Sequence, residues 1–286
     1  MNFWDKMQNI DVRIIYLVLL IVVALPLINP IGLPISYSKE TIMAYEAIDA
    51  LQPGDYIIMS ADYDPGGSAE LYPANLAVAR HAFKKGLKVI GYNQWDLGGQ
   101  LMKRALDKAA EDYGKQYGVD YVVLGYKIPL TVVLRLAISD AWTAWKADIN
   151  GTAFDQLPMM ADFRAINKDL SMVVPFCSGS PGLANWITYI GTPSRNPGPN
   201  NAEGFVRRVP IVSAHTSVEV PSAKANLQSG QISGLIAGGR GAAEYELMVG
   251  HPDSGITSMD AQSLGHVAII VFIILGNIGF LVTRNR

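Results

Sequence analysis

The chain has 286 residues, half of them apolar, with a formal net charge of −2 and a positive mean hydropathy. This near-neutral charge, without a basic patch, argues against nucleic-acid binding. The four histidines are scattered, and no H-x-x-x-H or C-x-x-C pair is present, so we expect no metal site and no cofactor. Because Cys177 is the single cysteine, no internal disulfide can form.

The first apolar run, IIYLVLLIVVALPLINPIGLP, begins at Ile14 and carries no charge. Its length of about 20 residues suits a hydrocarbon core about 30 Å thick. A cleavable signal peptide is the alternative. However, the run exceeds the usual apolar region of about 7 to 15 residues, and no A-x-A-like cleavage site follows it. We therefore expect an uncleaved transmembrane helix over residues 14–33, with Pro26 and Pro30 kinking or ending it.

A second apolar run, HVAIIVFIILGNIGFLV, begins at His266 and predicts another transmembrane helix over residues 266–283. Lys6 and Arg13 precede the first run, and Arg284 and Arg286 follow the second. Cations of this kind stay on the cytoplasmic side of a membrane. This pattern predicts a two-pass protein of the cell membrane, with the lipid bilayer as a partner.

The same cations set the expected orientation. Residues 1–13 and 284–286 should be cytoplasmic, and residues 34–264 should form a domain outside the cytoplasm, either periplasmic or at the cell surface.

Six short apolar runs in this domain are each followed by polar or glycine residues and then by a helical pattern. Their continuous apolar character is typical of strands that are buried on both faces of a parallel sheet. The alternation predicts an α/β fold with a doubly wound, mostly parallel, Rossmann-like sheet, flanked by an N-terminal and a C-terminal transmembrane helix. The runs cover residues 55–60, 88–92, 120–126, 172–176, 209–214 and 232–238.

The segment 130–145 is apolar nearly all round and predicts one helix that is covered on more than one side. This segment has more large apolar residues than a helix needs in order to pack one side on a sheet. The additional residues are Leu134, Ile138, Trp142 and Trp145. We therefore expect a homo-oligomer, or packing against other membrane-protein subunits. The alternative is that an insertion covers this helix within one chain, and the Pro-, Gly- and Asn-rich run 192–204 is the candidate.

The first candidate site is ADYDPGG, which follows the first strand. A dinucleotide fingerprint needs G-x-G-x-x-G, and the carboxylates of Asp62 and Asp64 repel phosphate. These carboxylates are suited instead to a cation or to sugar hydroxyls. The competing and favoured interpretation is that they cap a turn, which is a common role of Asp.

A second candidate site follows the last strand. Gly238 and Gly239, with Arg240 beside them, are suited to holding an anion at the start of a helix. The competing and favoured interpretation is that the glycines permit a tight strand-to-helix turn.

A third candidate site joins Cys177, just past the fourth strand, to His215, just past the fifth. If those strands are neighbours, thiol and imidazole can form a nucleophile and its base. A lone cysteine is more often a small buried apolar residue.

The pattern as a whole favours a membrane-anchored binding or scaffold protein outside the cytoplasm, self-associating or part of a membrane complex, over an enzyme. One alternative is a membrane-surface hydrolase that uses Cys177 and His215 or a carboxylate-bound cation. Another is a receptor domain for a small solute. The fold class alone does not distinguish these functions.

Overall fold

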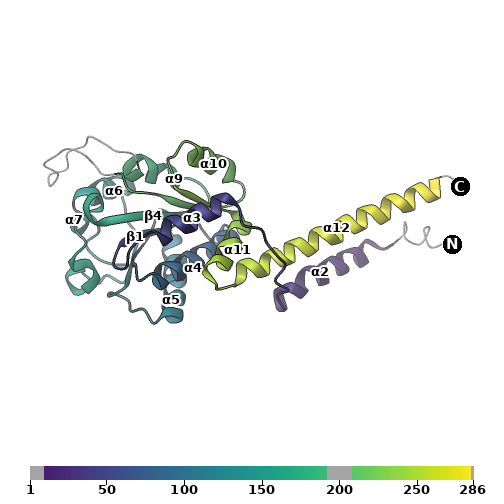
Figure 1. The fold of residues 1–286 in the computed structure, drawn as a ribbon, viewed down its shortest axis with the longest axis horizontal. Helices are drawn as coiled ribbons and strands as arrows, with labels where there is room; N and C mark the ends of the chain where they lie inside the picture. Colours follow the sequence, from purple (N-terminus) through teal and green to yellow (C-terminus); the bar gives the residue numbers. More distant parts are fainter. Residues whose placement is uncertain (1–9, 192–207, 285–286) are drawn as a thin grey trace. The chain divides into compact units, whose positions relative to one another are not determined.

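The computed structural model describes residues 10–191 and 208–284 of the chain (Figure 1). The chain divides into two compact units. One comprises Met1–Ile35 with Asp253–Arg286, and the other is Ser36–Pro252. The run 192–204 lies outside the described residues, so the prediction that it covers segment 130–145 is not tested.

The first unit is a pair of helices, α2 (Val12–Ile28) and α12 (Ser254–Arg284). They pack side by side (Figure 1), and Val23 lies so close to Gly265 that a Cβ there would be 3.3 Å from its Cγ2. After α2 the chain turns, and the Asp260 carboxylate on α12 accepts hydrogen bonds from three consecutive backbone N–H groups, those of residues 31–33. Asp260 on α12 therefore holds the residues that follow α2 in place.

Among the described residues, α12 is the one helix that is both long and apolar enough to cross a membrane. It begins at Ser254, well before the apolar run at His266. Helix α2 has 17 residues and ends at Ile28 rather than at residue 33. The N-terminal span that we predicted is therefore not confirmed, because the chain from Asn29 onward leaves the helix.

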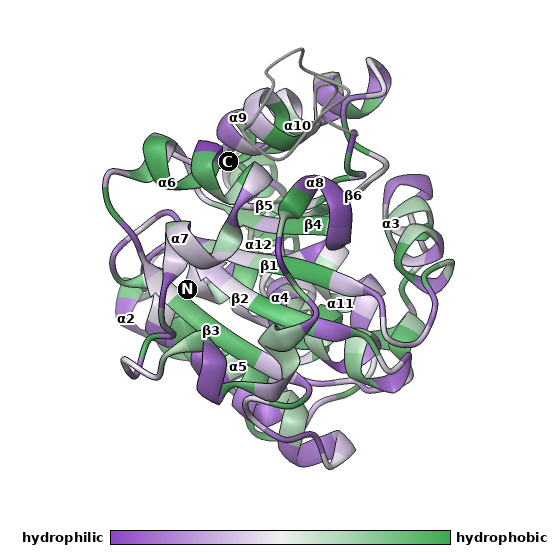
Figure 2. Ribbon diagram, turned by 90° about the vertical axis from the view of Figure 1, so that its left-hand side faces the viewer, coloured by the Kyte–Doolittle hydropathy of each residue, from purple (hydrophilic) through white to green (hydrophobic). Residues whose placement is uncertain are grey.

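The second unit contains a six-stranded sheet with the order β3-β2-β1-β4-β5-β6, and every neighbouring pair is parallel. This confirms the doubly wound α/β fold, because the order reverses between β1 and β4. Strands β1, β3 and β4 are coloured mostly hydrophobic in Figure 2, as expected for strands covered on both faces. The strands are β1 (Tyr56–Asp62), β2 (Lys88–Asn93), β3 (Tyr121–Tyr126), β4 (Leu170–Cys177), β5 (Val212–His215) and β6 (Gly234–Ala237).

Two separate hydrophobic cores fill the two faces of the sheet, because successive strand side chains point to opposite faces. The first core lies under α3 (Lys39–Asp49), α4 (Ser68–Lys84), α5 (Gly98–Tyr113) and α11 (Gly238–Val249). The second lies under the segments that link β3 to β4, β4 to β5 and β5 to β6. These contain α6 (Leu130–Ser139), α7 (Ala141–Trp145), the short helices Phe154–Gln156, Pro158–Ala161 and α8 (Ile166–Asp169), then α9 (Leu183–Trp186), a π-helix (Ile187–Gly191) and α10 (Val220–Gln228).

The single helix predicted over 130–145 is two helices. Asp140 lies between them with φ −150° and ψ 86°, and its carboxylate accepts the backbone N–H of Thr143 at the start of α7. An aspartate at such a position favours a new helix start over continuation of the old one.

Much of the apolar surplus that predicted assembly is packed within the second unit, although Ile138 and Trp142 are only half-buried. Leu134 and Trp145 are buried in the second core. The Trp142 indole N–H donates to two backbone carbonyls of segment 154–164, and the Arg164 guanidinium lies 4.0 Å from the centre of its ring. The chain's own residues 154–164 therefore contact Trp142, and the oligomer remains a prediction.

Candidate functional site

Three of the predicted site residues lie in one row across the sheet. Asp62 is paired in register with Cys177, and Cys177 with His215, at the carboxyl ends of β1, β4 and β5. Neighbouring strands are about 4.8 Å apart, so the row spans about 10 Å between the outer Cα atoms. All three side chains point to the face of the second core, because the residues four positions earlier in the chain, Ile58, Val173 and Ile211, line that core.

Asp62 is fully buried, and its carboxylate accepts four hydrogen bonds. The donors are the Ser60 hydroxyl, the Gln94 backbone and side-chain N–H groups, and the Trp186 indole N–H. Burial raises the pKa of the Asp62 carboxyl to about 6, although these four bonds act in the opposite direction. Asp62 therefore connects the ends of β1 and β2 to α9 inside the protein.

Asp64 has a different role. Its carboxylate accepts the backbone N–H groups of Gly66 and Gly67 at 2.9 and 3.3 Å, as in an Asx turn. The two aspartates do not converge on one point. Within residues 10–191 and 208–284, no group of three or more His, Cys, Asp or Glu side chains is placed to hold a metal ion.

Cys177 is buried between these strands and is a free thiol. Burial raises the pKa of the thiol well above its usual value, and the nearby Asp62 carboxylate acts in the same direction. The close approach of Gly182, where a Cβ would be 3.2 Å from the sulfur, leaves little space beside it. The geometry therefore favours a neutral, packed thiol, whereas a nucleophilic cysteine needs thiolate character and access.

His215 is the residue of the row that meets a cavity. Its side chain is 2% exposed, and its Nε2 lies 2.6 Å from the Ser213 hydroxyl oxygen. The Ser213 hydroxyl oxygen also lies 3.4 Å from the Pro175 carbonyl oxygen, and both hydrogen bonds form together only in the tautomer whose Nε2 carries the imidazole proton. Nδ1 is then an acceptor, and it is buried without a hydrogen-bond partner in the described part of the chain. Burial lowers the pKa of His215 to about 4, so the ring is neutral at pH 7.

The cavity has a volume of about 410 Å³ and lies between the segment that follows β4 and helix α10. Ser180 and Thr188 line it from the first of these, and Glu219, Ser222 and Asn226 from the second. Of the lining residues in the described chain, Glu219 is the one with an acidic side chain, and none of them is Lys or Arg. Its Oε2 lies 3.8 Å from His215 Nδ1. Ligands of open α/β sheets bind beyond the carboxyl ends of the strands, which is where this cavity opens onto His215.

Loops contact one another near the position where the strand order reverses. A Cβ on Gly67, in the loop after β1, would be 3.0 Å from Ser178 in the loop after β4. The Trp95 indole N–H, after β2, donates to the Pro181 carbonyl at 2.6 Å. These contacts pack the loops that follow β1, β2 and β4 against one another.

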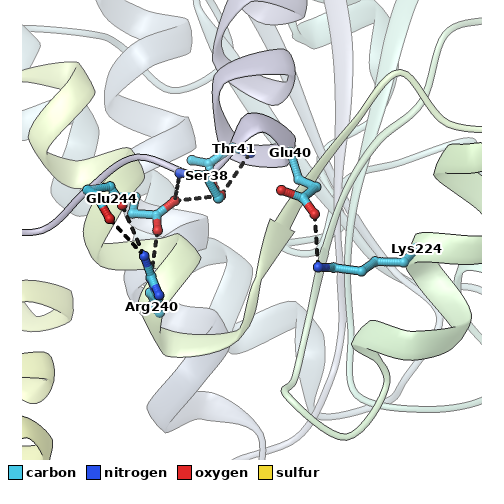
Figure 3. Close-up of polar contacts among 7 residues, drawn as sticks. Ser38, Glu40, Thr41, Lys224, Arg240 and Glu244 are labelled. Atoms are coloured by element: carbon cyan, nitrogen blue, oxygen red, sulfur yellow. Dashed lines mark hydrogen bonds and ion pairs between the residues drawn. The ribbon is translucent and has the colours of Figure 1, made fainter.

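Arg240 and the glycines before it do not line this cavity. The Arg240 guanidinium contacts the buried carboxylate of Glu244 at 2.9 Å (Figure 3). It also donates to the Ser36 carbonyl at 3.2 Å. Glu244 also accepts the backbone N–H and hydroxyl of Ser38, which begins α3. Arg240 therefore supports a contact between α11 and α3.

The turn before α11 is also occupied. Gly238 has φ +61°, and a Cβ there would be 2.5 Å from the Ser217 hydroxyl and 3.0 Å from the Glu70 carboxylate. Because Glu70 already lies at this helix start, an external anion would meet a negative charge. The arrangement agrees with the turn interpretation of Gly238 and Gly239.

Sequence reasoning missed the residues that surround His215 and Asp62. Ser213 and His215 are two residues apart on one strand, as are Ser60 and Asp62, and this spacing places each hydroxyl beside its partner. This two-residue spacing is visible in the sequence and could have indicated both pairs. The contacts of Gln94 and Trp186 with Asp62 span 32 and 124 residues of sequence, and no local pattern indicates them.

Comparison of the chain with protein-family models, curated proteins and solved structures finds no match.

Proposed function

We propose that this chain is a membrane-anchored binding protein whose α/β unit takes up a small polar solute in the cavity beside His215. The observation that carries the proposal is that His215 lines the cavity and that its buried Nδ1 lacks a hydrogen-bond partner among the described residues. A buried acceptor without a partner is costly, and a bound ligand removes that cost. The volume is within the range of about 300–1,000 Å³ that is usual for small-molecule sites.

The anchor is the helix pair of the first unit. Helix α12 is apolar enough to span, and α2 exposes large apolar side chains such as Leu20 and Leu25, which are 65% and 58% exposed. Apolar surface of this extent is disfavoured in water and suits a lipid environment. We propose that both helices lie in the membrane, with both termini in the cytoplasm and residues 36–252 outside it, as the flanking cations indicate.

Cysteine labelling tests this topology. With an impermeant reagent on intact cells, Ser229→Cys should react, whereas Asn2→Cys should react only after permeabilisation. Ser229 is exposed, and the native Cys177 is buried, so the unmodified chain provides a low background. Labelling of Asn2→Cys alone on intact cells would reverse the proposed orientation.

The hydrolase alternative has less support, because Cys177 is buried and protonated and makes no hydrogen bond with His215 among the described contacts. The scaffold alternative has lost its main support with the burial of Leu134 and Trp145. The binding function is therefore the one that the site favours.

A screen with a cavity-filling variant tests the binding function. The full chain in mild detergent is screened against a library of small polar solutes by thermal unfolding, since a ligand that binds the folded state raises the melting temperature. Ala184 lines the cavity, so Ala184→Trp should abolish the shift produced by any true ligand. Ala225→Trp, on the exposed side of α10 and outside the lining, should retain it. Shifts that persist in Ala184→Trp would exclude this cavity as the binding site.

A further inference from the structure

We infer that the solute is a small organic cation whose primary ammonium group binds between His215 Nδ1 and the Glu219 carboxylate. This inference rests on the proposed binding function and specifies its ligand. The two atoms are 3.8 Å apart. A nitrogen about 2.9 Å from each atom would be at ordinary hydrogen-bond distance, which their separation permits.

The protonation state of His215 selects a donor. In the tautomer that satisfies both contacts of Ser213, Nε2 carries the proton, and Nδ1, which lies 3.8 Å from the Glu219 carboxylate of the cavity lining, keeps its lone pair. A ligand oxygen without a hydrogen, such as that of a carboxylate or phosphate, would face this lone pair with another lone pair. An ammonium group has three N–H donors, enough for Nδ1, for Glu219 and for one further acceptor.

The charge of the lining selects a cation. Glu219 is the one acidic side chain among the described lining residues, and no described Lys or Arg is available there to neutralise it. Helix α10 begins at Val220, where the helix dipole favours an anion, but Glu219 immediately precedes it and meets that preference. An amine therefore meets a net negative site, with its charge-assisted bond to Glu219 stronger than a neutral one.

The rest of the lining suits a ligand with polar groups beyond the amine. Ser180, Thr188 and Ser222 contribute hydroxyls, and Asn226 contributes an amide, each able to donate and accept. The far end of the ligand is therefore a hydroxyl or a second neutral polar group.

Matched probes that differ in one group test the inference. On an aromatic scaffold they are tyramine, tyrosol and 4-hydroxyphenylacetate. On an aliphatic scaffold they are 5-aminopentanol, 1,5-pentanediol and 5-hydroxypentanoate. Binding to the full chain in detergent is measured by calorimetry at pH 7. On at least one scaffold the amine should bind at least about tenfold more tightly than the alcohol, and the acid should be weakest.

Glu219→Gln should reduce the amine affinity about tenfold and bring it close to that of the alcohol. Glu111→Gln, an exposed carboxylate on α5 outside the cavity, should leave both unchanged. Nitrogen-15 spectra of the histidine rings provide a second readout, since the Nδ1 signal of His215 should shift when the amine donates to it, and should not shift with the acid.

The outcomes separate this inference from the function on which it rests. Equal binding of amine and alcohol, tighter binding of the acid, or amine binding that Glu219→Gln leaves intact would overturn the ammonium assignment. So would a failure of every amine probe while other library solutes still bind in a way that Ala184→Trp abolishes. If no solute of any class depends on Ala184, the binding function itself is overturned.

Discussion

Substitution of Asp62 by asparagine should change how the stability of the protein depends on pH. Asp62 is fully buried, and its pKa is raised from 3.8 to about 6. For an acid whose folded-state pKa is raised, the folded state binds more protons than the unfolded state between these two values. The contribution to stability is therefore fully present below pH 3.8 and is lost as the pH rises through 6.

The size of the effect follows from the shift. One pKa unit corresponds to about 1.4 kcal/mol, so ionisation of Asp62 should lower the free energy of unfolding by about 3 kcal/mol between pH 3.5 and pH 7. Asparagine does not ionise and lacks this decline. Asparagine also has one acceptor oxygen where aspartate has two, so some of the donors on Gln94, Trp186 and Ser60 lose their acceptor. This loss should cost about 1–3 kcal/mol at every pH.

The measurement is urea denaturation of the full chain in detergent, followed by tryptophan fluorescence at several pH values from 3.5 to 7. The free energy of unfolding of Asp62→Asn, minus that of the unchanged protein, should rise by about 3 kcal/mol over this range. Taking this difference removes the contributions of all other titrating groups. A flat or falling difference would mean that the four hydrogen bonds outweigh burial and that the carboxyl is not held near a pKa of 6.

For His215→Gln, the difference in the free energy of unfolding between the variant and the unchanged protein should have the opposite slope. Because the pKa of His215 is lowered to about 4, the unchanged protein should lose about 3 kcal/mol of stability as the pH falls from 6.5 through 4. The variant has no imidazole and should not show this loss. A pH-independent difference would show that the ring is not held neutral by burial. Gly234→Ala should cost several kcal/mol or prevent folding, because its Cβ would be 2.4 Å from backbone atoms of α3, whereas Gly239→Ala, with no atom within 4 Å, should be tolerated. Thermal unfolding of the two variants checks this, and equal melting temperatures would contradict the packing of α3 on β6. Glu244→Ala should cost about 3 kcal/mol because it leaves Ser38 and Arg240 without their buried acceptor, while Lys224→Ala, which removes the partly exposed ion pair with Glu40, should cost about 0–1 kcal/mol (Figure 3). Urea denaturation compares the two, and a larger loss for Lys224→Ala would refute the ranking.

The sequence by itself determined the class of the fold. All six predicted strands are present, and their parallel pairing follows from apolar runs such as those of β1 and β4, which have no polar alternation to face water. The apolar run near the C-terminus is likewise found in a long helix, α12. These features are local, because the spacing of apolar residues over a few turns or a single strand determines them.

Only the tertiary structure decided which residues meet. The strand order placed Asp62, Cys177 and His215 in one row, and the same order left Arg240 with Glu244 and Ser36. The Arg240–Ser36 contact joins residues 204 positions apart, and the cover of Trp142 by residues 154–164 depends on how a connection returns over the sheet. Such contacts depend on the topology of the whole chain and on a core to which many residues contribute. The residue pattern of a single segment carries no information about either.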